Sequence, residues 1–94
     1  MSTVSPAGFV AVVHGHVQGV GFRWSTRRLA RELDVVGTVQ NLPDGTVKVI
    51  AEGGEASLQA LNDWLHSGPA AARVTRVTVS WQEPPGRYRD FDIV

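Results

Sequence analysis

Residues 9–24 read FVAVVHGHVQGVGFRW, and the pattern of this stretch changes twice along its length. Residues 9–14 are apolar and rich in β-branched side chains, which is typical of a strand. Three glycines then occur within residues 15–21, which predicts a backbone that turns sharply or lies close to another group. From Phe22 the apolar positions recur at spacings of three and four, so an amphipathic helix is expected over residues 22–33.

The rest of the chain also alternates between strand and helix patterns. Pro43-Asp44-Gly45 has turn chemistry, and Ser67-Gly68-Pro69 combines a glycine cap with a proline that stops a helix. Because no repeat or linker interrupts the chain, we expect a single domain over residues 1–94, with residues 1–8 as a flexible N-terminal tail. The further elements expected are strands at 35–42, 46–52, 74–81 and 91–94 and a helix at 55–66.

Two of these strands are polar on one side only, so one face of the sheet is expected to meet water. The positions expected on the core side are Val47, Val49, Ala51, Val77, Val79 and Trp81, and those on the solvent side are Thr46, Lys48, Glu52, Arg76, Thr78 and Ser80, with Ile50 as an apolar exception. The order βαββαβ plus a short terminal strand predicts an α+β fold. The arrangement that satisfies it best is a two-layer ferredoxin-like sandwich, an antiparallel sheet with two helices on one face.

The composition argues against several classes of function. The chain has no cysteine, which removes disulfides, thiolate nucleophiles and cysteine-bound zinc and fits a reducing, cytoplasmic location. No apolar run approaches the ~20 residues that span a bilayer, and residues 1–8 lack the features of a signal peptide. Nine basic and nine acidic residues cancel, so no general attraction to nucleic acid is expected. We therefore expect a cytoplasmic monomer with no membrane or nucleic-acid partner.

The glycine-rich loop and the residue that follows it have the properties of an anion site. A loop that leaves a strand and enters a helix presents several backbone N–H groups, with the positive end of the helix dipole behind them. Arg23 lies in the first helical turn, where its planar guanidinium can donate paired hydrogen bonds to phosphate oxygens. Glycines before a helix also fit a tight turn with no ligand, and the loop alone leaves both alternatives open.

The order of residues in the loop favours the anion site. Residues 15–23, GHVQGVGFR, resemble the acylphosphatase family signature G-x-V-Q-G-V-x-[FY]-R and match every specified position. Residues 37–41, GTVQN, followed by the Asp44-Gly45 turn, resemble a second signature of that family, G-x-V-x-N. The resemblance extends over residues 9–94. The chain departs from the commonest family form at Thr38, where an aromatic is usual, and at Gln40, where a basic residue is frequent.

The resemblance implies an enzyme that hydrolyses the carboxyl-phosphate bond of small acyl phosphates to a carboxylate and inorganic phosphate. It implies no metal and no organic cofactor. Carried over from the family, Arg23 and Asn41 are the catalytic residues: Arg23 holds the phosphoryl oxygens, and Asn41 orients a water for direct in-line attack. The phosphate-binding residues implied are His16, Val17, Gln18, Gly19, Val20 and Arg23.

Other residues with reactive or charged side chains have simpler interpretations. The three histidines include no pair at the i, i+4 spacing of helical metal sites, although His16 in the loop leaves a pH effect on phosphate affinity open. Ser25 and Thr26 lack a partner that would activate them, so hydrogen bonds within the first helical turn are expected. Trp24 is compatible with flanking the acyl group or with covering the helix. The arginines expected on the solvated outer face of the helix are Arg27, Arg28 and Arg31.

Two competing functions follow from the predicted fold. Sheets of this type also bind RNA, but such sheets need exposed aromatic residues, and the expected solvent face offers none. Carbamoyl phosphate is a second possible substrate, because similar domains occur in larger maturation proteins. The absence of a further domain argues against this reading. The signatures contact phosphate and water, so they leave the acyl group undefined.

Overall fold

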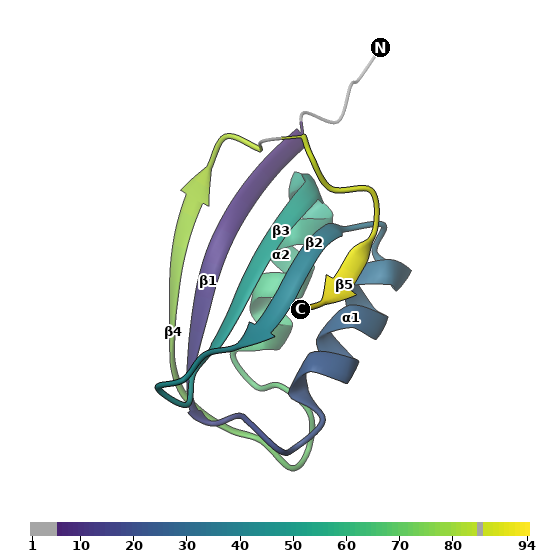
Figure 1. The fold of residues 1–94 in the computed structure, drawn as a ribbon. Helices are drawn as coiled ribbons and strands as arrows, with labels where there is room; N and C mark the ends of the chain where they lie inside the picture. The colour runs from purple at the N-terminus through teal and green to yellow at the C-terminus, as the bar shows by residue number, and fades with distance from the viewer. Residues whose placement is uncertain (1–5, 85) are drawn as a thin grey trace.

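The computed structural model describes residues 6–84 and 86–94, which form one five-stranded sheet and two helices (Figure 1). Both helices lie against the same face of the sheet. This is the α+β, ferredoxin-like arrangement expected from the sequence, with each predicted element in its expected order. The elements are β1 Pro6–His16, α1 Phe22–Glu32, β2 Val36–Asn41, β3 Val47–Gly54, α2 Glu55–Leu65, β4 Arg73–Gln82 and β5 Phe91–Ile93.

The strands lie in the order β4-β1-β3-β2-β5. Strand β3 pairs antiparallel with both β1 and β2, and β4 pairs antiparallel with β1. The sheet is nevertheless mixed, because β5 runs parallel to β2. Since β1 and β2 are both antiparallel to β3, they run in the same direction. Their carboxyl ends therefore lie at the same edge of the sheet.

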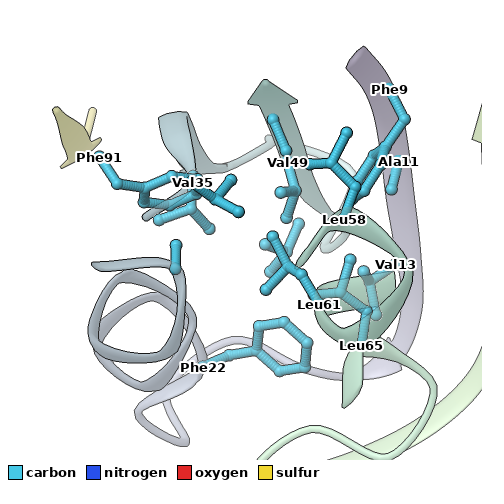
Figure 2. Close-up of a cluster of buried hydrophobic side chains, with 14 of the residues drawn as sticks. Phe9, Ala11, Val13, Phe22, Val35, Val49, Leu58, Leu61, Leu65 and Phe91 are labelled. Atoms are coloured by element: carbon cyan, nitrogen blue, oxygen red, sulfur yellow. The ribbon is translucent and has the colours of Figure 1, made fainter. Parts of the chain in front are cut away.

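The hydrophobic core fills the space between the sheet and the two helices (Figure 2). Leu58, Leu61 and Leu65 project from α2 and are fully buried against the strands. Phe22 from the start of α1 and Phe91 from β5 complete the layer on the other side. Full burial of side chains of this size stabilises a fold by roughly 1.5–3 kcal/mol each, so this layer anchors both helices to the sheet.

Strand β1 begins earlier than the sequence indicated. Pro6, Ala7 and Gly8 pair with the end of β3, so the expected tail is wrong for residues 6–8. A proline is tolerated here because it stands at the first position of the strand. The remainder of the predicted tail, residues 1–5, lies outside the described residues.

Two residues expected on the solvent side are buried. Glu52 is only 5% exposed because the chain after β4 returns over it, and Glu83 and Tyr88 line a cavity together with Glu52. Thr46 is 6% exposed because it bonds to Asp44 and lies under the loop that follows β1. Alternation along a strand predicts which face a side chain lies on, but a loop from elsewhere decides whether that face meets water.

Trp81 differs in the opposite sense. It was expected in the core, yet it is 45% exposed and packs edge-to-face on Phe9, with 5.4 Å between ring centroids. The reason is the position of β4 at the margin of the sheet, because α2 packs on β1 and β3. The side chain is on the predicted face but beyond the cover of the helices.

Gly15 ends the regular pairing of β1 with β4. The register shifts between His14 and Gly15, and Gly15 has a φ of 126°. A Cβ atom at this position would overlap the carbonyl oxygen of Arg73 on β4. Only glycine therefore allows the close approach of the two strands at the point where the chain leaves the sheet for the loop.

Replacing Gly15 with alanine is expected to lower the free energy of unfolding by more than the same change at Gly45. Both glycines have positive φ, but no atom lies within 4 Å of a Cβ built at Gly45, so Gly45→Ala adds backbone strain alone. Strain of that kind costs about 1–2 kcal/mol. We expect Gly15→Ala to cost at least ~1 kcal/mol more, measured by urea unfolding. Equal losses would show that the contact with Arg73 relaxes without cost.

Candidate active site

The loop after β1 and the last residue of β2 meet at one edge of the sheet. β1 ends at His16, α1 begins at Phe22, and Asn41 is the last residue of β2. Between them lies a cavity of about 70 Å³, lined by Val17, Gly19, Gly21, Phe22, Arg23, Trp24 and Asn41. A cavity of this volume suits a small group.

The backbone of the loop leaves several donors without side-chain acceptors. Gly19 and Gly21 have φ of 75° and 79°, whereas Gln18 and Val20 do not have positive φ. Alternation of left- and right-handed residues turns successive N–H groups toward one side and forms an anion-binding concavity. Gly21 is the N-cap of α1 and supplies no side-chain cap, and the first turn contains no acidic residue. The first N–H groups of the helix are therefore available to an anion.

Arg23 adds a full positive charge to this end of the helix. Its side chain is exposed and lines the cavity. Among the described residues, no carboxylate forms an ion pair with it. The guanidinium is thus not committed to another protein group, and its paired donors match the oxygens of a phosphate.

Asn41 lines the same cavity and carries an unpaired acceptor. Its Oδ1 atom is buried and has no hydrogen-bond partner in the part of the chain that the structure describes. Leaving such an atom unpaired costs about 1–3 kcal/mol, and so its presence needs an explanation. Glu52 Oε2 and Asn62 Oδ1 are also unpaired, but neither lines this cavity. Among the residues that line this cavity, Asn41 is therefore the one with an unpaired buried acceptor, and its contact with a ligand or water stays a prediction.

Gln18 connects the loop to the hairpin that carries Asn41. Its Nε2 atom donates to the carbonyl oxygens of Leu42, at 2.8 Å, and Thr46, at 2.9 Å. The sequence assigned Gln18 to phosphate binding, and its side-chain contacts across the hairpin were missed. The sequence contained one signal for these contacts. A glutamine, whose side-chain amide has two donor hydrogens, stands at a specified position of the loop signature.

The turn between β2 and β3 is held by Asp44. Its Oδ1 atom accepts from the Thr46 hydroxyl at 2.6 Å and from the Thr46 backbone N–H at 3.0 Å. These two hydrogen bonds, the hydroxyl first, hold the pKa of Asp44 below its usual value. Asp44 accordingly has the structural role predicted for it. The ionised Asp44 carboxylate stabilises the turn fully at pH values above the ordinary carboxyl pKa. This stabilisation is lost as the pH falls through the lowered pKa of Asp44.

The structure brings together only part of the predicted site. Val17, Gly19, Arg23 and Asn41 line the cavity. The other three predicted residues lie beside it: His16 is exposed at the end of β1, Gln18 points its amide toward the hairpin, and Val20 is half-buried against the core. The phosphate-binding and catalytic roles of all seven residues remain predictions.

One side chain of α1 has the structural role expected of it, and another makes a contact that was not expected. The hydroxyl of Thr26 donates to the carbonyl oxygen of Phe22 at 2.7 Å, as predicted. Arg31 makes a bidentate contact with Asp90, at 3.1 and 2.8 Å, which ties α1 to the segment before β5. The backbone N–H of Phe91 and then Arg31 lower the pKa of Asp90. Sequence reasoning missed this pair because its members are far apart in the chain.

Comparison with known proteins agrees with the fold and with the loop signature. The family model described as Acylphosphatase matches residues 9–93. The chain belongs to the acylphosphatase family. It is 58% identical over 74 residues to an acylphosphatase of Thermococcus kodakarensis. The aligned residues cover 79% of this chain and 81% of the relative. The family resemblance noted in the sequence is thereby confirmed.

Solved acylphosphatase structures have the same fold. The crystal structure of the acylphosphatase from Bacillus subtilis superposes with a TM-score of 0.90 at 33% identity, covering 94% of this chain and 98% of the other. An acylphosphatase from Coxiella burnetii gives a TM-score of 0.90 at 37% identity, covering 95% and 93%. Family and fold together support an enzyme that hydrolyses acyl phosphates.

The described residues contain no candidate metal site and no candidate membrane-spanning helix. No three His, Asp or Glu side chains gather in them into a group that could hold a metal ion. None of the helices they form is long and apolar enough to cross a membrane.

We expect Gln18→Ala to lower both stability and phosphate affinity. The change removes two hydrogen bonds, each contributing about 0.5–1.5 kcal/mol, and frees the loop from the hairpin. Gln40→Ala is the matched control, because Gln40 is exposed on β2 and its loss should change the unfolding free energy by less than ~0.5 kcal/mol. Urea unfolding and titration with inorganic phosphate measure the two effects. Unchanged phosphate binding in Gln18→Ala would show that the loop holds its shape without this contact.

Proposed function

We propose that the chain hydrolyses small acyl phosphates by direct in-line attack of water on phosphorus. The phosphate is held by the loop over residues 15–20 and by Arg23, and the water is oriented by Asn41. One observation carries the proposal: a single small cavity is lined by the first turn of α1, by Arg23 and by Asn41. Among the described residues, Arg23 has no ion pair, the helix has no side-chain cap, and the Asn41 amide oxygen is unpaired.

The positive side of the cavity suits a phosphoryl group. In phosphoryl transfer, negative charge spreads over three equatorial oxygens while the attacking and leaving oxygens lie roughly in line. The loop N–H groups and the dipole of α1 oppose that charge from one side. Arg23 opposes it with two parallel donors from the first turn of the same helix. The loop N–H groups belong to the backbone, so this part of the proposed site would need little reorganisation during the reaction.

The unpaired oxygen of Asn41 suits a water molecule. An amide oxygen accepts a hydrogen bond from water, and this contact leaves a lone pair of the water free to face phosphorus. Asn41 does not remove a proton in this scheme. Its contribution is position, because a fixed water converts an encounter in solution into a reaction within one complex.

The chemistry of the substrate explains why no general acid is required. The new bond joins the water oxygen to phosphorus, and the bond between phosphorus and the carboxylate oxygen breaks. The electron pair leaves on the carboxylate, which is stable as an anion because carboxylic acids have pKa values near 4. One hydrogen of the water stays on the phosphate product and the other is released as a proton.

Other assignments from the sequence stay predictions. RNA binding is disfavoured because the outer positions of β3 and β4 carry Lys48, Arg76, Thr78 and Ser80, with no aromatic ring among them. Carbamoyl phosphate is itself a small acyl phosphate, and the phosphate and water contacts do not discriminate against it. The cytoplasmic location and the monomeric state rest on composition, and sedimentation of the purified protein measures the second.

Removing either catalytic group should lower turnover without unfolding the protein. We expect Arg23→Ala and Asn41→Ala each to reduce kcat/KM for acetyl phosphate by at least ~10²-fold, the scale seen when one transition-state donor is lost. Arg23 is exposed and Asn41 half-buried, so thermal unfolding should change little in either variant.

Matched controls separate site effects from general effects. Arg76→Ala removes an exposed arginine from edge strand β4, and Gln40→Ala removes an exposed amide next to Asn41. Both should keep rates within about twofold of the unmodified protein, well below the ~10²-fold effect expected at the site. Near-normal hydrolysis in Arg23→Ala or Asn41→Ala would refute the assigned roles.

Hydrolysis should also be insensitive to metal chelators. Arg23 and the helix N–H groups supply the positive charge in the proposed scheme. We expect the rate of acetyl phosphate hydrolysis to stay within about twofold after exhaustive dialysis against EDTA, because no step is assigned to a metal ion. A large loss that is restored by adding Mg²⁺ would contradict the scheme.

A further inference from the structure

Trp24 is the most exposed large apolar side chain among the described residues. Its side chain is 66% exposed, and it lines the same cavity as Arg23 and Asn41. An indole of this size in water leaves a large apolar surface unburied. Isolated exposed apolar residues are common, so the position of Trp24 at the rim of the cavity, rather than its exposure alone, calls for an explanation.

The ring is held by a neighbour on the same helix. The guanidinium carbon of Arg27 lies 4.4 Å from the centroid of the Trp24 ring, within the range of a cation–π contact. Among the described residues, no carboxylate forms an ion pair with Arg27. One face of the indole is thus occupied by Arg27, and the remaining surface is presented at the edge of the cavity. A ring restrained in this way loses little freedom when a ligand packs on it.

The other residues of the cavity offer no comparable surface. Val17 and Phe22 are buried almost completely, so their side chains belong to the core. Gly19 and Gly21 have no side chain, and Asn41 is polar. Of the residues that line the cavity, Trp24 alone presents a large apolar group to solvent.

The size of the cavity determines where an acyl group would go. With about 70 Å³, the cavity is small, and a phosphoryl group in it would leave little room for an acyl chain as well. In-line attack also requires the leaving carboxylate to stand opposite the water, which directs the acyl group out of the cavity toward its rim. The apolar surface available at that rim is Trp24.

We infer that Trp24 is a specificity-determining residue on which the acyl group packs, so that the favoured substrates are acyl phosphates with a planar aromatic acyl group. The inference rests on the proposed function and adds the substrate class to it. Aromatic rings pack on one another in offset or edge-to-face arrangements that an acetyl group cannot make.

The test compares two substrates on the same enzyme. Benzoyl phosphate carries an aromatic acyl group and acetyl phosphate carries a methyl group, while the phosphate is the same in both. We expect Trp24→Ala to lower the ratio of kcat/KM for benzoyl phosphate to that for acetyl phosphate by about tenfold. The loss should appear mainly as a higher KM for benzoyl phosphate, because the contact exists before and during the reaction.

Three further variants control the comparison. Trp24→Phe keeps an aromatic ring and should recover most of the ratio, whereas a residue that only covers the helix would give the same ratio in both variants. Trp81→Ala removes a tryptophan that is also exposed but packs on Phe9, away from the cavity, and should leave the ratio unchanged. Arg27→Ala frees the indole ring and should lower the ratio by a smaller factor than Trp24→Ala.

The outcomes separate this inference from the function on which it rests. If the unmodified protein hydrolyses both substrates and Trp24→Ala keeps the original ratio, the role of Trp24 is wrong and the proposed function stands. If the unmodified, folded protein hydrolyses neither substrate, the proposed function fails and the inference fails with it. A lowered ratio that Trp24→Phe restores supports both.

Discussion

Strand β3 lies between β1 and β2 and pairs antiparallel with both, and the geometry of the candidate site depends on this pairing. It makes β1 and β2 parallel, so the loop that leaves β1 and the residue that ends β2 emerge at the same edge of the sheet. The pairing is supported by the buried layer between the sheet and α2. A slip of β2 by one residue would turn Val39 out of the core and move Asn41 to the opposite face.

The groups of the candidate site come from different elements and are held together by polar contacts with the backbone. Arg23 belongs to α1 and Asn41 to β2, and their side chains make no bond with each other. Gln18 links the loop before α1 to the hairpin that carries Asn41, because its amide donates to the carbonyl oxygens of Leu42 and Thr46. In a site that acts by position and charge alone, such contacts matter as much as the groups that would touch the substrate.

Much of the fold was accessible from the sequence because local patterns and global packing agree. The strand at residues 9–14 and the helix from Phe22 formed as expected, although β1 runs from Pro6 to His16 and takes in the first two residues of the expected loop. Two failures in placing side chains of the sheet share one cause. Glu52 was placed in water and Trp81 in the core, since alternation shows the face of the sheet and carries no information about what covers it. The parallel pairing of β5 with β2 likewise depends on how the chain returns after β4.

The sequence by itself determined the order of elements, the family and the chemical types at the site, because each depends on residues close together in the chain. The run of residues 15–23 contains the turn glycines and Arg23 in a fixed order, and Asn41 follows in its own short block. Only the tertiary structure decided that Arg23 and Asn41 face one cavity and that Trp24 stands at its rim. It also decided that Gln18 bonds to the hairpin. These facts depend on contacts between residues far apart in the chain, which form only when the sheet is assembled and the helices cover it.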